Sequence, residues 1–144
     1  MNLSEHFSIE ELTCSDVAAR NGWGNYPDLV ELENLTRLAE LLEQVRMVLN
    51  KSIMINSGYR SKQVNDAVGS KDTSQHRLGC AADIRVSGMT PDAVCKAIRE
   101  SEIQFDQLIK EFDSWTHISV TNNANDTPRN QMLVIDNSGT RAFR

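Results

Sequence analysis

The chain has 144 residues, a formal net charge of −5, and 40% hydrophobic and 24% charged residues. This length suits a single domain with one core, and the acidic balance gives nucleic acid or anionic membranes no electrostatic reason to bind. No apolar run approaches the roughly 18 residues of a membrane span, and the start, MNLSEHFSIEEL, lacks the basic and apolar regions of a secretory signal. We therefore expect a protein without a signal peptide, cytoplasmic on synthesis, with no membrane insertion and no nucleic-acid partner.

Capping residues and apolar spacing predict the helices. Ser8 and Glu11 form a capping-box pattern that predicts a short helix at SIEEL, and residues 21–28 are rich in turn formers. Apolar side chains then recur at helical spacing from Asp28 to about Asn50, which predicts a long amphipathic helix. Residues 61–68 predict a short helix or turn, and Thr90 followed by Pro91 predicts a helix over 91–101.

Strand patterns dominate the remainder of the chain. Residues 52–56, 80–86, 105–112 and 115–121 have strand character, and 131–136 and 140–143 predict a final hairpin around NSG. Because helices come first and strands follow, we expect an α+β fold with helices on one face of a small antiparallel sheet. The sparse, odd set of Cys14, Cys80 and Cys95 predicts free thiols rather than a disulfide framework.

Strand parity brings two chemically useful side chains to one face. In CAADIRV, Asp83 points away from Ala82 and Ile84, and in WTHISVT, His117 points away from its apolar neighbours. His76 precedes the first strand on a loop that can curl over this face. Two imidazoles and a carboxylate suit zinc and leave a fourth position for water, although such residues are also common as solvated surface groups.

Three stretches resemble a known family. They are SGYRS at 57–61, SQHRLGCAADI at 74–84 and FDQLIKEFDSWTHIS at 105–119. They resemble the zinc D-Ala-D-Ala metallopeptidases, which include D-Ala-D-Ala carboxypeptidases, vancomycin-resistance dipeptidases and phage L-alanyl-D-glutamate endopeptidases. The family pattern is S-x-H-x-x-G-x-A-x-D followed by W-x-H. The similarity covers about residues 30–121 and is greatest to the short, single-domain branch common in phage genomes.

The resemblance implies a set of site residues. It makes His76, Asp83 and His117 the Zn²⁺ ligands and Arg60 the residue that binds the substrate carbonyl or carboxylate and steadies the oxyanion. Ser74 and Gln75 are implied to line the cleft and contact substrate. Tyr59 either packs beneath Arg60 or borders the substrate site, and Trp115 is expected to pack behind His117.

The resemblance leaves the general base open. Family members with E-x-x-H or D-x-x-H place the acid three residues before the last ligand, where this chain has Ser114. Glu111 and Asp113, which share the strand face of His117, are the candidates for moving protons. We expect Glu111 first, because DQLI-x-E before W-x-H recurs in the short branch, and Asp113 second.

The resemblance also implies the overall architecture and reaction. The fold is the small antiparallel sheet of the hedgehog and D-Ala-D-Ala peptidases, with zinc on the open face, as one peptidase domain over 1–144 (1–27 an N-terminal helix and loop, 28–144 the catalytic core). The implied substrate is a peptidoglycan stem peptide, cut by a monomeric carboxypeptidase or murein endopeptidase, for example a phage endolysin that reaches the periplasm or cell wall through a holin. The alternative is a non-catalytic virion or structural protein that retains the fold and the metal.

Overall fold

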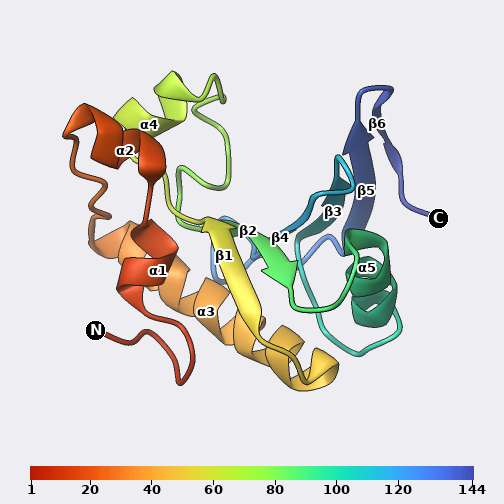
Figure 1. Cartoon of the computed structure of the whole chain (residues 1–144). Helices are drawn as coiled ribbons and strands as arrows, with labels where there is room; N and C mark the ends of the chain where they lie inside the picture. Colours follow the sequence, from red (N-terminus) through yellow and green to blue (C-terminus); the bar gives the residue numbers. More distant parts are fainter.

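The computed structural model describes all 144 residues, and the two termini lie at opposite ends of the molecule (Figure 1). Five helices and six strands follow one another along the chain. They are α1 (Ile9–Thr13), α2 (Asp16–Asn21), α3 (Leu29–Leu49), β1 (Ile53–Ser57), α4 (Lys62–Ala67), β2 (Ala81–Val86), α5 (Pro91–Arg99), β3 (Gln107–Glu111), β4 (Trp115–Ser119), β5 (Gln131–Asp136) and β6 (Gly139–Ala142).

The helices begin where their capping residues predict. Ser8 and Glu11 form the predicted capping box of α1, and Thr90 caps α5 with Pro91 in its first turn. The helix α2 was not predicted from the sequence. It has only six residues, too few to show an apolar period, although Ser15 caps its start and Gly22, with φ 67°, ends it in the left-handed region.

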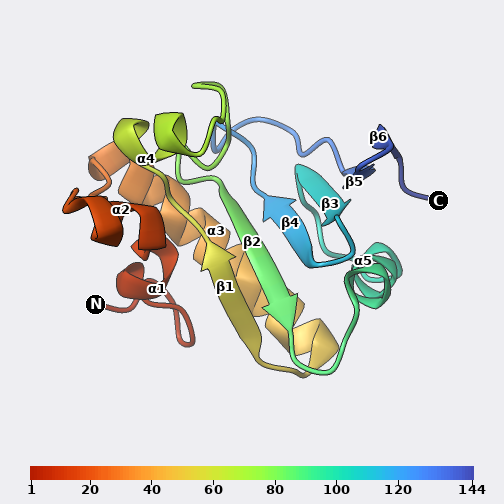
Figure 2. The same ribbon diagram turned by 45° about the horizontal axis from the view of Figure 1, so that its top comes forward.

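The sheet has the strand order β1-β2-β4-β3-β5-β6. Four of its five strand pairings are antiparallel, which confirms the α+β prediction, but β5 runs parallel to β3. Strand β4 already occupies one edge of β3, so the loop 120–130 carries the chain across the end of β3 to its other edge. Strand β1 forms one edge of the sheet, with α1 beside it (Figure 2).

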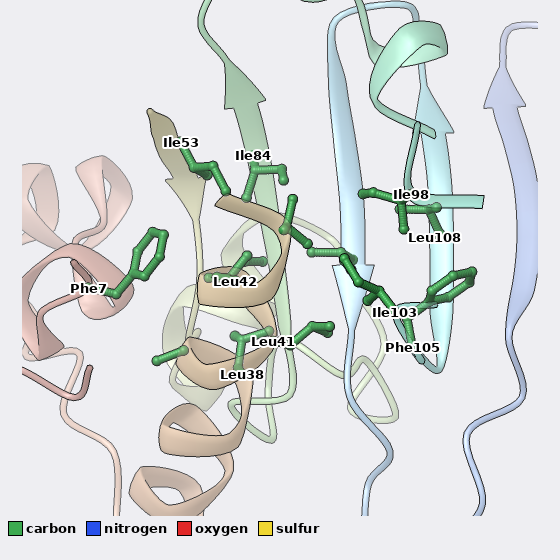
Figure 3. Close-up of a cluster of buried hydrophobic side chains, with 14 of the residues drawn as sticks. Phe7, Leu38, Leu41, Leu42, Ile53, Ile84, Ile98, Ile103, Phe105 and Leu108 are labelled. Atoms are coloured by element: carbon green, nitrogen blue, oxygen red, sulfur yellow. The ribbon is translucent and has the colours of Figure 1, made fainter. Parts of the chain in front are cut away.

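One face of the sheet carries the hydrophobic core. Leu38 and Leu42 of α3 and Ile98 of α5 pack with Ile84 and Leu108 of the sheet, all fully buried (Figure 3). Each such side chain contributes about 2 kcal/mol by leaving water. The helices α3 and α5 therefore cover the face predicted to be apolar, which leaves the opposite face of β2 and β4 for polar side chains.

Candidate metal centre

Asp83 and His117 are direct partners across two neighbouring strands. The register of β2 and β4 pairs Asp83 with His117 and pairs Ala82 with Ile118. Because side chains alternate along a strand, Ala82 and Ile118 enter the core while Asp83 and His117 lie together on the other face. The strand parity expected from the sequence is thus confirmed by the pairing.

His76 reaches the same place from a series of tight turns. The backbone amides of Arg77 and Gly79 donate to the carbonyls of Ser74 and His76, which folds the segment back on itself just before β2. Gly79 has φ 79°, and a Cβ atom there would lie 2.7 Å from the carbonyl oxygen of Glu31 in α3. A glycine is therefore needed both for the backbone conformation and for the close approach to the helix.

The three side chains form a compact, buried cluster. Oδ1 of Asp83 lies 3.0 Å from Nδ1 of His117 and 3.3 Å from Nε2 of His76. All three potential ligand atoms lie within 4.8 Å of one another. The residues retain only 4%, 7% and 8% of their accessible surface for His76, Asp83 and His117. The three side chains therefore combine the donor types of a metal site with ligand atoms close together and largely shielded from solvent.

A hydrogen bond determines which nitrogen His76 presents. Its Nδ1 lies 2.8 Å from the carbonyl oxygen of Gly58 and must donate to it, because a carbonyl only accepts. In the neutral imidazole Nε2 is then unprotonated and faces the Asp83 carboxylate. Two acceptors at this distance repel each other unless a proton or a cation lies between them, so the arrangement fits a bound metal ion.

The electrostatics keep Asp83 ionised. Burial opposes its charge, but the electrostatic and hydrogen-bonding interactions of Asp83 with the two imidazoles outweigh burial and hold the pKa of Asp83 well below its usual range. Nη2 of Arg60 lies 3.7 Å from Oδ2 of Asp83 and adds a further positive charge at the rim of the cluster. The Arg60 backbone amide also donates to the carbonyl oxygen of His76 at 3.0 Å, which ties the arginine segment to the ligand loop.

The two candidate acids occupy very different environments. Oε1 of Glu111 lies 3.9 Å from Nδ1 of His117, and the Glu111 side chain is 17% exposed. Burial, followed by the nearby charge of Asp83, raises the pKa of Glu111 above its ordinary value. Asp113 lies in the β3–β4 turn with φ 51°, is 78% exposed and pairs with Lys110. The geometry therefore favours Glu111 over Asp113 as the acid next to the cluster.

Three further residues from the sequence prediction lie in supporting positions. Ser74 accepts the backbone amide of His76 at its hydroxyl, 3.3 Å away, so it supports the ligand turn. Gln75 is buried and its amide nitrogen donates to Asp106 at 2.9 Å, which does not favour the predicted contact with a substrate. Tyr59 is 3% exposed, which favours the predicted packing role over a place at the substrate surface.

Two interactions that organise the site were not predicted from the sequence. Asn25 lies in the predicted loop 21–28, but its buried side chain donates to the carbonyl of Tyr59 at 2.9 Å and accepts from the amide of Ser61 at 2.7 Å. Asn25 therefore fixes the backbone on both sides of Arg60. Trp115 was expected to pack behind His117, whereas its indole nitrogen donates to Glu111 at 3.0 Å. Neither interaction has a signal in the sequence, because both join segments far apart or across a turn.

The comparison with known families agrees with this geometry. Residues 5–119 match the family described as peptidase M15. The chain belongs to the peptidase M15 family. M15 proteins are zinc-dependent peptidases, so the substrate class is a peptide and the buried His-Asp-His cluster has the composition that such a peptidase needs for its metal. The match begins earlier than the resemblance predicted, so the segment with α1 and α2 is part of the family region.

Three further observations concern the chain as a whole. No curated protein sequence matches it significantly. No helix in the structure combines the length and the hydropathy that crossing a membrane requires. The three cysteines are unpaired, as the sequence predicts, with Cys80 and Cys95 buried and Cys14 exposed.

Proposed function

We propose that the protein is a zinc peptidase that hydrolyses a peptide bond in peptidoglycan stem peptides. The observation that carries this proposal is the joint placement of His76, Asp83 and His117 with a half-buried guanidinium and a half-buried carboxylate at their rim. A structural zinc site usually has four protein ligands, whereas three ligands with two charged groups alongside are typical of a catalytic site. The peptidase family of the chain supports the same conclusion.

His76 through Nε2, His117 through Nδ1 and Asp83 through its carboxylate would hold the zinc ion. Zinc in such a site supplies Lewis acidity, which polarises a carbonyl and makes water more acidic. The hydrogen bond from His76 to Gly58 orients one ligand in advance, so less reorganisation is needed when the metal binds.

Glu111 and Arg60 would carry the proton transfer and the charge stabilisation. Glu111 accepts a proton from the water that attacks the scissile carbonyl and returns it to the nitrogen of the leaving amine. Its raised pKa lies nearer to neutral pH than that of an ordinary carboxyl group, and a group whose pKa is near the working pH can both accept and return a proton. Arg60 donates to the oxygen on which negative charge develops, a role suited to a permanently charged, planar group.

The choice of bond separates two activities. A carboxypeptidase removes a terminal D-Ala, whereas a murein endopeptidase, as in a phage endolysin, cuts within the stem or the cross-link. The protein would meet its substrate in the periplasm or the cell wall, for example after release by a holin. A free, monomeric domain suits this task. The residues described above could act in the hydrolysis of either bond. The proposal therefore concerns the reaction class, and the released muropeptides identify the bond.

Digestion of purified peptidoglycan by the zinc-loaded protein, with mass spectrometry of the released muropeptides, tests this function and identifies the bond. We expect wild-type protein to release new amine termini, Glu111→Gln to lose at least about a hundredfold in rate, and Asp113→Asn to retain most of it. If the wild type releases no fragment at saturating zinc, the protein is not this enzyme.

The alternative is a virion or structural protein that retains the fold and the metal without turnover. It rests on Ser114, which stands where related enzymes have an acid three residues before the last ligand. The position of Glu111 beside His117 weakens that argument, because the β3–β4 hairpin delivers a carboxylate to the site from six residues upstream. Metal binding without any peptide release would favour the structural role.

A further inference from the structure

We propose that Arg85 binds a carboxylate of the substrate next to the scissile bond, so that the site prefers stem peptides with a free carboxylate over the same peptides with a carboxamide. This inference rests on the proposed function and names a feature of its substrate. Arg85 lies on β2, two residues beyond Asp83 and on the same face of the sheet. Two residues of a strand span about 7 Å, the span of about two residues of an extended peptide.

Arg85 lines a groove along the edge strand β1. Its largest part, about 680 Å³, is lined by Arg85 and by residues of β1, with Cys14 on the α1 side. A second hollow shares Cys14 and Arg85 with the first. A third shares Cys14 and Asn56 with the second and is lined by Arg60 at its other end. Arg60 and Arg85 therefore line neighbouring hollows that share residues at the β1 edge of the sheet.

The guanidinium of Arg85 is held in place but has no acidic partner. Its Nε donates to the backbone carbonyl of Ser114 at 3.1 Å, which directs the side chain toward the β3–β4 turn. No carboxylate lies within 4.0 Å of it, whereas Arg77, Arg129 and Arg141 each pair with an acid. The two terminal nitrogens of Arg85 remain available as the parallel donors that match a carboxylate.

The charges around the groove restrict where a carboxylate can bind. Glu11 and Asp16 line it from the α1 and α2 side and repel an anion there. Arg60 is engaged with Asp83 at the other end. Arg85 is thus the one cation of the groove that has no anionic partner. Stem peptides of peptidoglycan carry carboxylates that occur either free or amidated, which supplies two natural versions of one substrate.

The test uses two synthetic stem peptides that contain the bond identified by muropeptide analysis and differ only in a free carboxylate or a carboxamide beside it. We expect the wild type to cleave the acid with a kcat/KM about tenfold higher than the amide, the range of a charge-assisted hydrogen bond. Arg85→Gln should cleave both peptides at the rate at which the wild type cleaves the amide. Arg46→Gln, which removes the same charge from α3 behind the sheet, should keep the preference.

Binding separates this inference from the proposed function. Calorimetric titration of zinc-loaded Glu111→Gln protein with each peptide measures the preference without turnover, and the double variant Glu111→Gln with Arg85→Gln should bind both peptides equally. If the wild type cleaves the acid and the amide equally well, or if Arg85→Gln weakens both alike, the proposal for Arg85 is wrong while the peptidase activity stands. If no peptide is cleaved but the binding preference depends on Arg85, the groove binds carboxylates and the catalytic function is wrong.

Discussion

The indole nitrogen of Trp115 donates a hydrogen bond to Oε2 of Glu111 at 3.0 Å, while Oε1 of the same carboxylate lies 3.9 Å from Nδ1 of His117. Glu111 and Trp115 are register partners at the end of the β3–β4 hairpin, where the chain turns through Phe112 and Asp113 with φ 53° and 51°. One carboxylate oxygen is therefore anchored across the hairpin and the other lies on the side of His117 in the candidate metal cluster. Oε2 thus accepts the hydrogen bond that fixes the carboxylate, and Oε1 remains available for proton transfer.

Replacement of Trp115 by Phe keeps an aromatic ring and removes the donor. We expect Trp115→Phe to lower kcat by about tenfold with little change in KM, because the loss of one hydrogen bond to a charged group lets Glu111 reorient. Steady-state kinetics on a cleaved peptide and zinc content by mass spectrometry measure this effect. Trp23→Phe, in the loop before α3, is the control and should have wild-type kinetics. A large rise in KM or loss of zinc in Trp115→Phe would contradict a positioning role.

Replacement of any of the three candidate ligands should weaken zinc binding, whereas replacement of the remaining histidine should not. We expect wild-type protein to bind one zinc ion per chain, and His76→Ala, Asp83→Ala and His117→Ala each to weaken binding by at least about a hundredfold, since a three-ligand site loses a ligand. Competition with a chromogenic chelator measures these affinities. His6→Ala serves as the matched variant. His6 lies in the N-terminal segment, where it contacts Glu43 of α3, away from the cluster. Wild-type affinity in any of the three ligand variants would remove that residue from the site.

A substitution at Gly58 should lower the zinc affinity indirectly, through the orientation of His76. A Cβ atom at Gly58 would collide with the backbone carbonyl of Leu12, and that carbonyl also accepts the amide of Tyr59. Gly58→Ala must displace the segment whose carbonyl orients His76. We expect about a tenfold loss of zinc affinity, within the range for the loss of a group that orients a ligand. Gly69→Ala is the comparison, because an added Cβ there meets no neighbouring atom and the backbone strain from its φ of 75° lies away from His76. Unchanged zinc binding in folded Gly58→Ala would show that the orienting contact is dispensable.

Asp106 predicts a pH-dependent contribution to stability. Its buried carboxylate accepts two hydrogen bonds from the Arg129 guanidinium, at 3.0 and 2.7 Å, and this interaction lowers the pKa of Asp106 in the folded state. A lowered folded pKa stabilises the protein at pH values above the unfolded pKa of about 4, and the contribution is lost as the pH falls through the folded value. Asp106→Asn should therefore lower the free energy of unfolding by about 2 kcal/mol at neutral pH.

Urea denaturation at pH 7 and at about pH 3 measures this difference. The gap between wild type and Asp106→Asn should shrink at the acidic pH, which lies below the unfolded pKa of about 4, because the carboxylate of the unfolded wild type is then largely protonated. Asp126→Asn, in an exposed loop, should leave the stability unchanged at both pH values. An equal gap at pH 7 and pH 3 would mean that the charge of Asp106 does not stabilise the fold.

The sequence by itself determined most of the local elements, though not α2, and the identity of the ligand candidates. Capping boxes and apolar periods are short-range signals, so α1, α3 and α5 begin where Ser8, Asp28 and Thr90 predict. Strand parity follows from the geometry of one strand, and it placed Asp83 and His117 on the polar face before their pairing was known. The motif around His76 supplied the third ligand by resemblance.

Only the tertiary structure decided which of these residues meet and what supports them. The parallel pairing of β3 with β5, the hydrogen bonds of Asn25 around Arg60, and the position of Glu111 beside His117 all depend on contacts between segments distant in the chain or on the course of a turn. The sequence pattern records which residues face inward in an element, because burial is repeated along it. It does not record a single contact made by one side chain in the assembled fold, because no periodic signal accompanies such a contact.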